Sequence, residues 1–239
     1  MQFIDTHIHL QDDTTNNTTE IVAYAQNCGC TKMLCVSSTE SDWEKVAMLT
    51  EQFPQMIVPA FGLHPWHLST VKSGWQNHLQ EYLHKFPQAV IGECGLDGIK
   101  PEIDGQQQLF AEQIKLAKEY QRPVVIHAVK AVPLLEKFWK ELPKKFVFHG
   151  FNGKAELLQK ILKTGGYIGI GAGLLKSSKA EEILKQIPAD KLLFESDAPY
   201  QAPYAWSIKE QAKKIAVLRG ENLEKLTKQV YSNSLEFIK

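Results

Sequence analysis

The sequence predicts an α/β fold, a (β/α)₈ barrel, and two observations carry the prediction. Short apolar runs rich in Ile, Val and Phe alternate with longer stretches of helical periodicity, and eight such runs fit within 239 residues. This alternation predicts a parallel sheet buried on both faces, and eight units of this length can close into a barrel. A doubly wound open sheet is the alternative, but no Gly-rich phosphate loop follows any of the runs. We expect a single domain over residues 1–239, because barrels of about 200 to 250 residues commonly form one domain.

Each element has a local signal. Strands are expected at residues 2–9, 32–37, 57–63, 89–95, 123–128, 145–150, 167–172 and 191–196. Helix starts are predicted where a capping residue precedes Glu or Gln by three positions, at Asn17, Ser41, Asp104, Ser178 and Ser207. The segment 221–239 after Gly220 is expected to form a final amphipathic helix on the outside of the barrel.

Composition excludes several classes of protein. The 27 basic residues balance the 27 acidic ones, so no global positive field draws polyanions to the surface. No stretch approaches the roughly 18 apolar residues of a membrane span, and no leader precedes the first strand, so we expect a cytoplasmic protein with no membrane contact. The four cysteines form no C-x-x-C pair and are expected to be reduced.

Side chains with metal-binding chemistry fall at the predicted C-terminal ends of the strands, where barrel enzymes place their reactive groups. In FIDTHIHL, His7 and His9 lie two positions apart, so they share a face of the strand and can converge on one point. The whole set, in chain order, is His7, His9, His64, Glu93, His127, His149 and Asp197.

Imidazole and carboxylate together suit first-row divalent metals, and two ions need about six to eight protein ligands with a bridging carboxylate. We expect Glu93 to bridge, with His7, His9 and Asp197 completing one centre and His127 and His149 the other. The expected catalytic residues are Glu93 and Asp197, the latter as proton acceptor for the attacking water. A lone histidine in an apolar strand is more often a core residue. Several of them buried with two acids at one barrel end would be costly without a ligand.

Six ordered motifs, DTHIHL, GLHP, GECGLD, PVVIHA, HGFNG and ESDAPY, resemble those of the TatD family of metal-dependent deoxyribonucleases within the amidohydrolase superfamily. The resemblance covers residues 2 to about 235. It implies a slightly distorted (β/α)₈ barrel that hydrolyses phosphodiesters, often from a 3′ end, with two divalent ions, commonly Mg²⁺ or Mn²⁺. It also implies that His7, His9, Glu93, His127, His149 and Asp197 are metal ligands and that His64 is a pocket residue. The imidazole-rich ligand set is also expected to take Zn²⁺.

The sequence departs from the family pattern after the strand-five histidine. Many members carry an arginine where this chain has Val129, and Lys130 follows one residue later. We expect His64, Lys130 and Asn152 to contact substrate, Asn152 through free N–H groups at the start of the helix after strand six. Trp66 beside the pocket mouth either stacks on a base or packs at the rim.

The sequence is compatible with three functions. The first is a two-metal nuclease that acts on DNA or oligonucleotides and needs no obligatory protein partner. The second is a metal-dependent deacylase on the same barrel, acting on a small or tRNA-linked acyl group. Many such amidohydrolases bridge their metals with a modified lysine from strand four, where this chain has Glu93, and that difference favours the nuclease. The third is a non-catalytic binding protein, which the complete set of ligands makes the least favoured.

Overall fold

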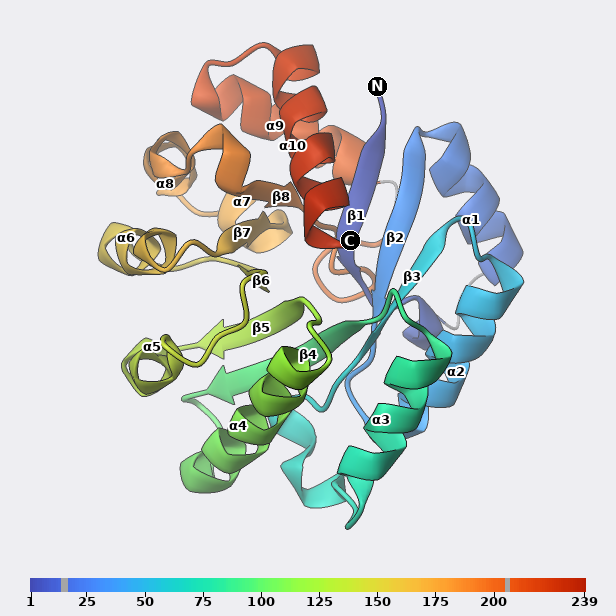
Figure 1. The fold of residues 1–239 in the computed structure, drawn as a ribbon. Helices are drawn as coiled ribbons and strands as arrows, with labels where there is room; N and C mark the ends of the chain where they lie inside the picture. Colours follow the sequence, from blue (N-terminus) through green and yellow to red (C-terminus); the bar gives the residue numbers. More distant parts are fainter. Residues whose placement is uncertain (14–16, 205–206) are drawn as a thin grey trace.

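The computed structural model describes residues 1–13, 17–204 and 207–239, and it contains the predicted barrel (Figure 1). Each strand pairs in parallel with the next along the chain, in the order β1 to β8. All eight predicted strands are confirmed, with ends that shift by a few residues. They are β1 Phe3–Ile8, β2 Cys30–Val36, β3 Ile57–Phe61, β4 Val90–Asp97, β5 Val124–Val129, β6 Phe146–Phe148, β7 Tyr167–Ile170 and β8 Leu192–Phe194.

Helices surround the sheet on its outer side (Figure 1). Their buried faces pack on the outward-facing apolar residues of the strands and form the larger of two core clusters. The helices are α1 Thr18–Asn27, α2 Glu40–Gln52, α3 Trp75–Lys85, α4 Ile103–Glu119, α5 Val132–Leu135, α6 Ala155–Lys163, α7 Ala172–Leu175, α8 Ala180–Gln186, α9 Ser207–Arg219 and α10 Leu223–Phe237. No described helix is long and apolar enough to cross a membrane.

The barrel closes where β8 meets β1, and this seam is its irregular part. The Asp197 amide donates to the His7 carbonyl over 2.8 Å, and the His9 amide donates to the Ala198 carbonyl over 2.8 Å. The Thr6 hydroxyl adds a bond of 3.0 Å to the Phe194 carbonyl. The bonds between the ends of these two strands therefore hold the residues after β8 directly beside His7 and His9.

The inside of the barrel is filled by alternate strand residues, as the two-residue period of a strand requires. These include Ile4, Leu34, Val90 and Val147, and they form a second cluster with Phe237 from the end of α10. The final helix was expected on the outer wall. Instead its end covers the centre of the barrel (Figure 1), because the buried aromatic ring of Phe237 closes the opening at the N-terminal ends of the strands.

Several predicted helix starts are wrong by one to three residues. Asn17 caps α1 as predicted and accepts from the Thr19 amide over 2.9 Å. At α2 the cap is Thr39 rather than Ser41, because the Asp42 carboxylate accepts from the Thr39 amide over 2.8 Å and so fixes the chain two residues earlier. Helices α4 and α8 begin after Glu102 and Lys179, and α6 begins only at Ala155, so Asn152 does not start a helix.

Candidate metal centre

The predicted site residues come together at the C-terminal ends of the strands. β1 carries His7, with His9 one residue beyond its end, and β4 and β5 contribute Glu93 and His127. The remaining residues, His64, His149 and Asp197, follow β3, β6 and β8. All except His7 line a hollow of about 460 Å³. His7 lies directly behind it, fully buried.

Glu93 lies among the histidines, and its two oxygens face different ones. Oε1 lies 2.6 Å from His149 Nε2, 2.8 Å from His127 Nδ1 and 3.2 Å from His64 Nε2. Oε2 lies 3.2 Å from His7 Nε2 and 3.5 Å from His9 Nε2. A carboxylate with one oxygen directed at each of two donor groups has the arrangement that a bridge between two cations requires.

Asp197 completes the group around His7 and His9. Its Oδ1 lies 3.5 Å from His9 Nε2 and 3.8 Å from His7 Nε2. Its Oδ2 accepts from Gln201 Nε2 over 2.6 Å, and the Gln201 amide donates to the Asp197 carbonyl over 2.8 Å. Asp197 has a φ of 51°, a conformation that non-glycine residues rarely adopt, so its carboxylate is fixed by the surrounding contacts.

Three sets of donor atoms are close enough to surround an ion. They are His7 with His9 and Asp197, His7 with Glu93 and His149, and His64 with Glu93 and His127, and within each set the ligand atoms lie within 4.8 Å of one another. Nitrogen and carboxylate oxygen donors of this kind bind divalent first-row metals. The donors present therefore fit divalent metal ions.

The charges of these groups depend strongly on one another. Burial opposes the ionisation of Glu93, but the facing histidines His149, His64 and His7 hold its pKa well below the usual value. Burial likewise opposes the protonation of His149, yet the charge of Glu93 raises the His149 pKa to about 10. For His7, burial and the neighbouring His149 lower the pKa to about 4.

Three further carboxylates contact the site and were not identified from the sequence. Asp97 Oδ2 lies 3.3 Å from His127 Nε2, on the side of that ring away from Glu93. Glu195 Oε1 accepts from the Gly150 amide over 2.5 Å and lies 3.9 Å from His149 Nδ1. Asp5 accepts from the Ser196 amide over 2.9 Å and so ties β1 to the segment after β8.

Asp97 stands behind His127 as carboxylates do in metal sites, where they fix the ring and its tautomer, whereas Glu195 is too far from His149 for a hydrogen bond. A signal for all three was present in the sequence, because each lies an even number of residues from a predicted ligand in the same motif: Asp5 before His7, Asp97 after Glu93, and Glu195 before Asp197.

The predicted substrate contacts have different positions. His64 lines the hollow, whereas Lys130 and Asn152 are exposed and are not among the described residues that line it. Val129, at the position where an arginine was expected, does line it. His67, which was not among the predicted site residues, also lines the hollow.

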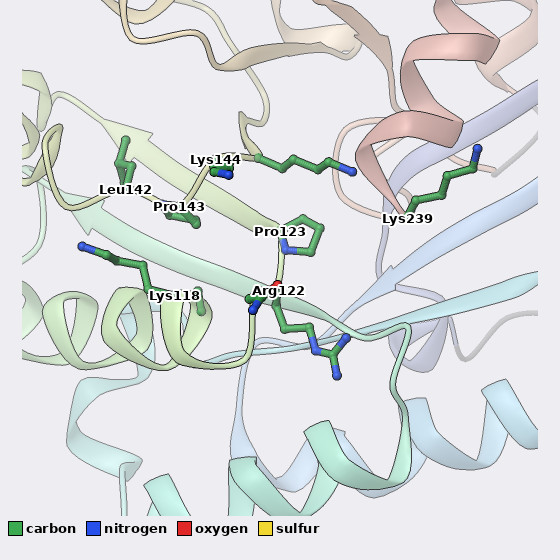
Figure 2. Close-up of a pocket in the computed structure, with 10 residues that line it drawn as sticks. Lys118, Arg122, Pro123, Leu142, Pro143, Lys144 and Lys239 are labelled. Carbon is green, nitrogen blue, oxygen red and sulfur yellow. The ribbon is translucent and has the colours of Figure 1, made fainter.

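The second large hollow, of about 580 Å³, lies at the opposite end of the barrel (Figure 2). Pro123, directly before β5, marks that end, and the lining is rich in cations such as Arg122, Lys144 and Lys239. None of the predicted metal ligands lines this hollow, and they lie instead at the C-terminal ends of the strands.

Comparison with known proteins finds similarity along the whole chain. The sequence pattern of the family described as TatD related DNase matches residues 4–239. The Escherichia coli K12 protein YjjV, described as an uncharacterized metal-dependent hydrolase, is 32% identical over 207 residues, which cover 83% of this chain and 80% of that protein. The 3′-5′ ssDNA/RNA exonuclease TatD of Pantoea ananatis is 30% identical over 236 residues, 90% of each chain.

A solved structure has the same fold. The crystal structure of the TatD homologue YjjV from E. coli K12 superposes with a TM-score of 0.91 at 27% identity and covers 98% of this chain and 97% of that one.

Proposed function

Because the chain belongs to the family of TatD-related DNases, we propose that it is a two-metal phosphodiesterase that removes nucleotides from the 3′ end of DNA or oligonucleotides. The observation that carries the proposal is the position of Glu93, which directs one oxygen at His7 and His9 and the other at His64, His127 and His149. That arrangement is the one expected of a carboxylate between two cations.

We assign His7, His9, Glu93 and Asp197 to one ion and Glu93, His127 and His149 to the other. The donor types are compatible with Mg²⁺, Mn²⁺ or Zn²⁺. When bound, such a pair supplies Lewis acidity toward a phosphate oxygen and lowers the pKa of a water toward neutrality.

Side chains of the protein transfer the proton, position the ligands and contact the substrate. The Asp197 carboxylate is the proton acceptor for the attacking water, and Gln201 keeps it in place through the 2.6 Å bond to Oδ2. Asp97 holds the ring of His127 from behind, and the charge of Glu195 lies 3.9 Å from Nδ1 of His149. His64, with its Nε2 directed at the same Glu93 oxygen as His127, is positioned to contact the phosphate or to join the second ion.

A metal-dependent deacylase is the second candidate, and one observation favours it. Val129 rather than an arginine lines the hollow, so one cation that would recognise a phosphate is replaced by an apolar group.

Lys130 and Asn152 lie outside that lining, and we propose them as contacts for a longer substrate. We also propose a cytoplasmic location.

The two candidates are separated by substrate. We expect purified protein to shorten a 5′-labelled single strand from its 3′ end with Mg²⁺, Mn²⁺ or Zn²⁺ and to leave a panel of acyl esters and amides intact. Glu93→Gln should lower kcat more than about a hundredfold, beyond the 10–100-fold typical of changes behind the ligands, and should release metal measured per chain. Cleavage of the acyl panel alone would replace the nuclease with the deacylase.

A further inference from the structure

Two large aromatic side chains at the rim of the site are exposed yet held in place. Trp66 is 54% exposed and Tyr200 is 67% exposed, and both line the hollow. The Trp66 Nε1–H donates to Asp97 Oδ2 over 2.5 Å, and the Tyr200 hydroxyl donates to Asp12 Oδ2 over 3.0 Å. Each ring is thus fixed through its polar atom while its apolar surface stays in contact with solvent.

The two rings stand beside different donor sets. The Trp66 ring lies 5.2 Å from the His64 ring and 6.1 Å from the His127 ring, centroid to centroid. The Tyr200 ring lies 5.1 Å from the His9 ring. Glu93 lies between His9 on one side and His64 and His127 on the other. Tyr200 and Trp66 therefore lie on opposite sides of Glu93.

A cation accompanies the indole. Lys100 Nζ lies over one face of the Trp66 ring, 4.6 Å from its centroid, and the Lys100 side chain is exposed, so it can leave that face when a base stacks there. An ammonium group beside an exposed aromatic ring is the combination by which proteins bind single-stranded nucleic acid, because the ring stacks on a base while the cation pairs with the neighbouring phosphate.

We propose that Trp66 and Tyr200 are stacking platforms for the two bases that flank the scissile phosphate, with Lys100 pairing with the backbone beside Trp66. The inference rests on the proposed nuclease function and names the side chains that would hold an unpaired 3′ end. Within a duplex both faces of a base are covered by its neighbours, so only bases freed from the helix can present a face to rings on opposite sides of the site.

The first test uses cleavage. We compare single strands that carry an abasic residue at the terminal or the penultimate position with the intact strand, for the wild type, Trp66→Ala and Tyr200→Ala. In the wild type, each abasic residue should lower kcat/KM about tenfold, the value of one stacked base. Each variant should lose this discrimination at one of the two positions through a higher KM for the intact strand.

The second test measures stacking without turnover. In chelator-treated protein, 2-aminopurine in the last two positions of a single strand should be quenched on binding. The quenching should fall in Trp66→Ala and Tyr200→Ala and persist in Trp66→Phe, which keeps a ring without the bond to Asp97. Tyr24→Ala, which removes a 55% exposed tyrosine of α1 outside the hollow, is the matched control and should behave as the wild type.

The outcomes separate the two proposals. If the wild type cleaves single strands but both alanine variants keep full abasic discrimination and quenching, the platforms are refuted and the nuclease stands. If the wild type neither cleaves nor quenches any strand, the nuclease fails and the platforms fail with it. Equal cleavage of blunt duplex and single strand by the wild type would refute the requirement for an unpaired end.

Discussion

At the scale of single residues, the site depends on one buried carboxylate that keeps its charge. Glu93 is only 3% exposed, and an isolated carboxylate at such a position would become protonated. Histidines on both of its sides offset that penalty and keep the Glu93 pKa low. The same proximity that stabilises the carboxylate brings the imidazole nitrogens within reach of common ions.

Residue chemistry explains what the sequence could and could not predict about this site. Glu93, Asp197 and the strand-end histidines were predictable because their positions follow from the strand ends, which apolar runs mark clearly. Asp97 and Trp66 were harder to connect, since the bond between them joins the end of β4 to the segment after β3. Such a contact depends on the path of a connecting segment, which local sequence patterns do not determine.

Asp5 should make stability depend on pH. Burial raises its pKa to about 7 from the ordinary value of 3.8, so the folded protein binds a proton that the unfolded chain releases. This contribution to stability is present below about pH 4 and is lost as pH rises toward 7, by at most about 4 kcal/mol. In chelator-treated protein, the Tm of Asp5→Asn should rise relative to the wild type between pH 5 and 8. Parallel Tm curves would contradict this account of Asp5.

At the scale of elements, strands were predicted better than helix starts. A strand in this barrel is an apolar run buried on both sides, so its signal is spread over several residues. A helix start depends on which of several neighbouring polar side chains makes the capping bond. Near residue 40 the sequence predicts a start at Ser41, but the bonds of Asp42 to the Ser38 and Thr39 amides place the cap at Thr39.

The α2 cap can be tested with a matched pair of variants. Asp42→Ala removes the acceptor of both amides and should lower the free energy of unfolding by about 1–2 kcal/mol. Glu44 is the acidic residue three positions after Ser41, the cap that the sequence predicts. Glu44→Ala should change the free energy of unfolding by at most about 0.5 kcal/mol. Urea denaturation of both variants measures the difference, and the reverse order would show that the cap lies at Ser41.

At the scale of the whole molecule, the two ends of the barrel are built differently. One end carries the histidines and carboxylates in an open hollow, and at the other the end of α10 packs on the residues that fill the barrel, with the cation-lined hollow nearby. The amphipathic pattern of residues 221–239 predicted a helix correctly. It did not show that the helix covers the end of the barrel, because an apolar face does not specify which surface it covers.

Closure by α10 should matter for the entire fold. Phe237 is fully buried against strand residues from around the barrel interior, so Phe237→Ala should lower the free energy of unfolding by about 3–5 kcal/mol. Val217→Ala on α9, at a side chain 78% exposed, is the control and should have little effect. If urea denaturation finds Phe237→Ala as stable as the control, α10 does not contribute to the core as described.

The most direct measurement of the central claim is anomalous diffraction from crystals grown with Zn²⁺. Two peaks are expected, one near each oxygen of Glu93 at about 2.0–2.2 Å, with the first also bound by His7, His9 and Asp197 and the second by His127 and His149. A single peak, or peaks that do not contact Glu93, would contradict the assignment of this carboxylate as the bridge.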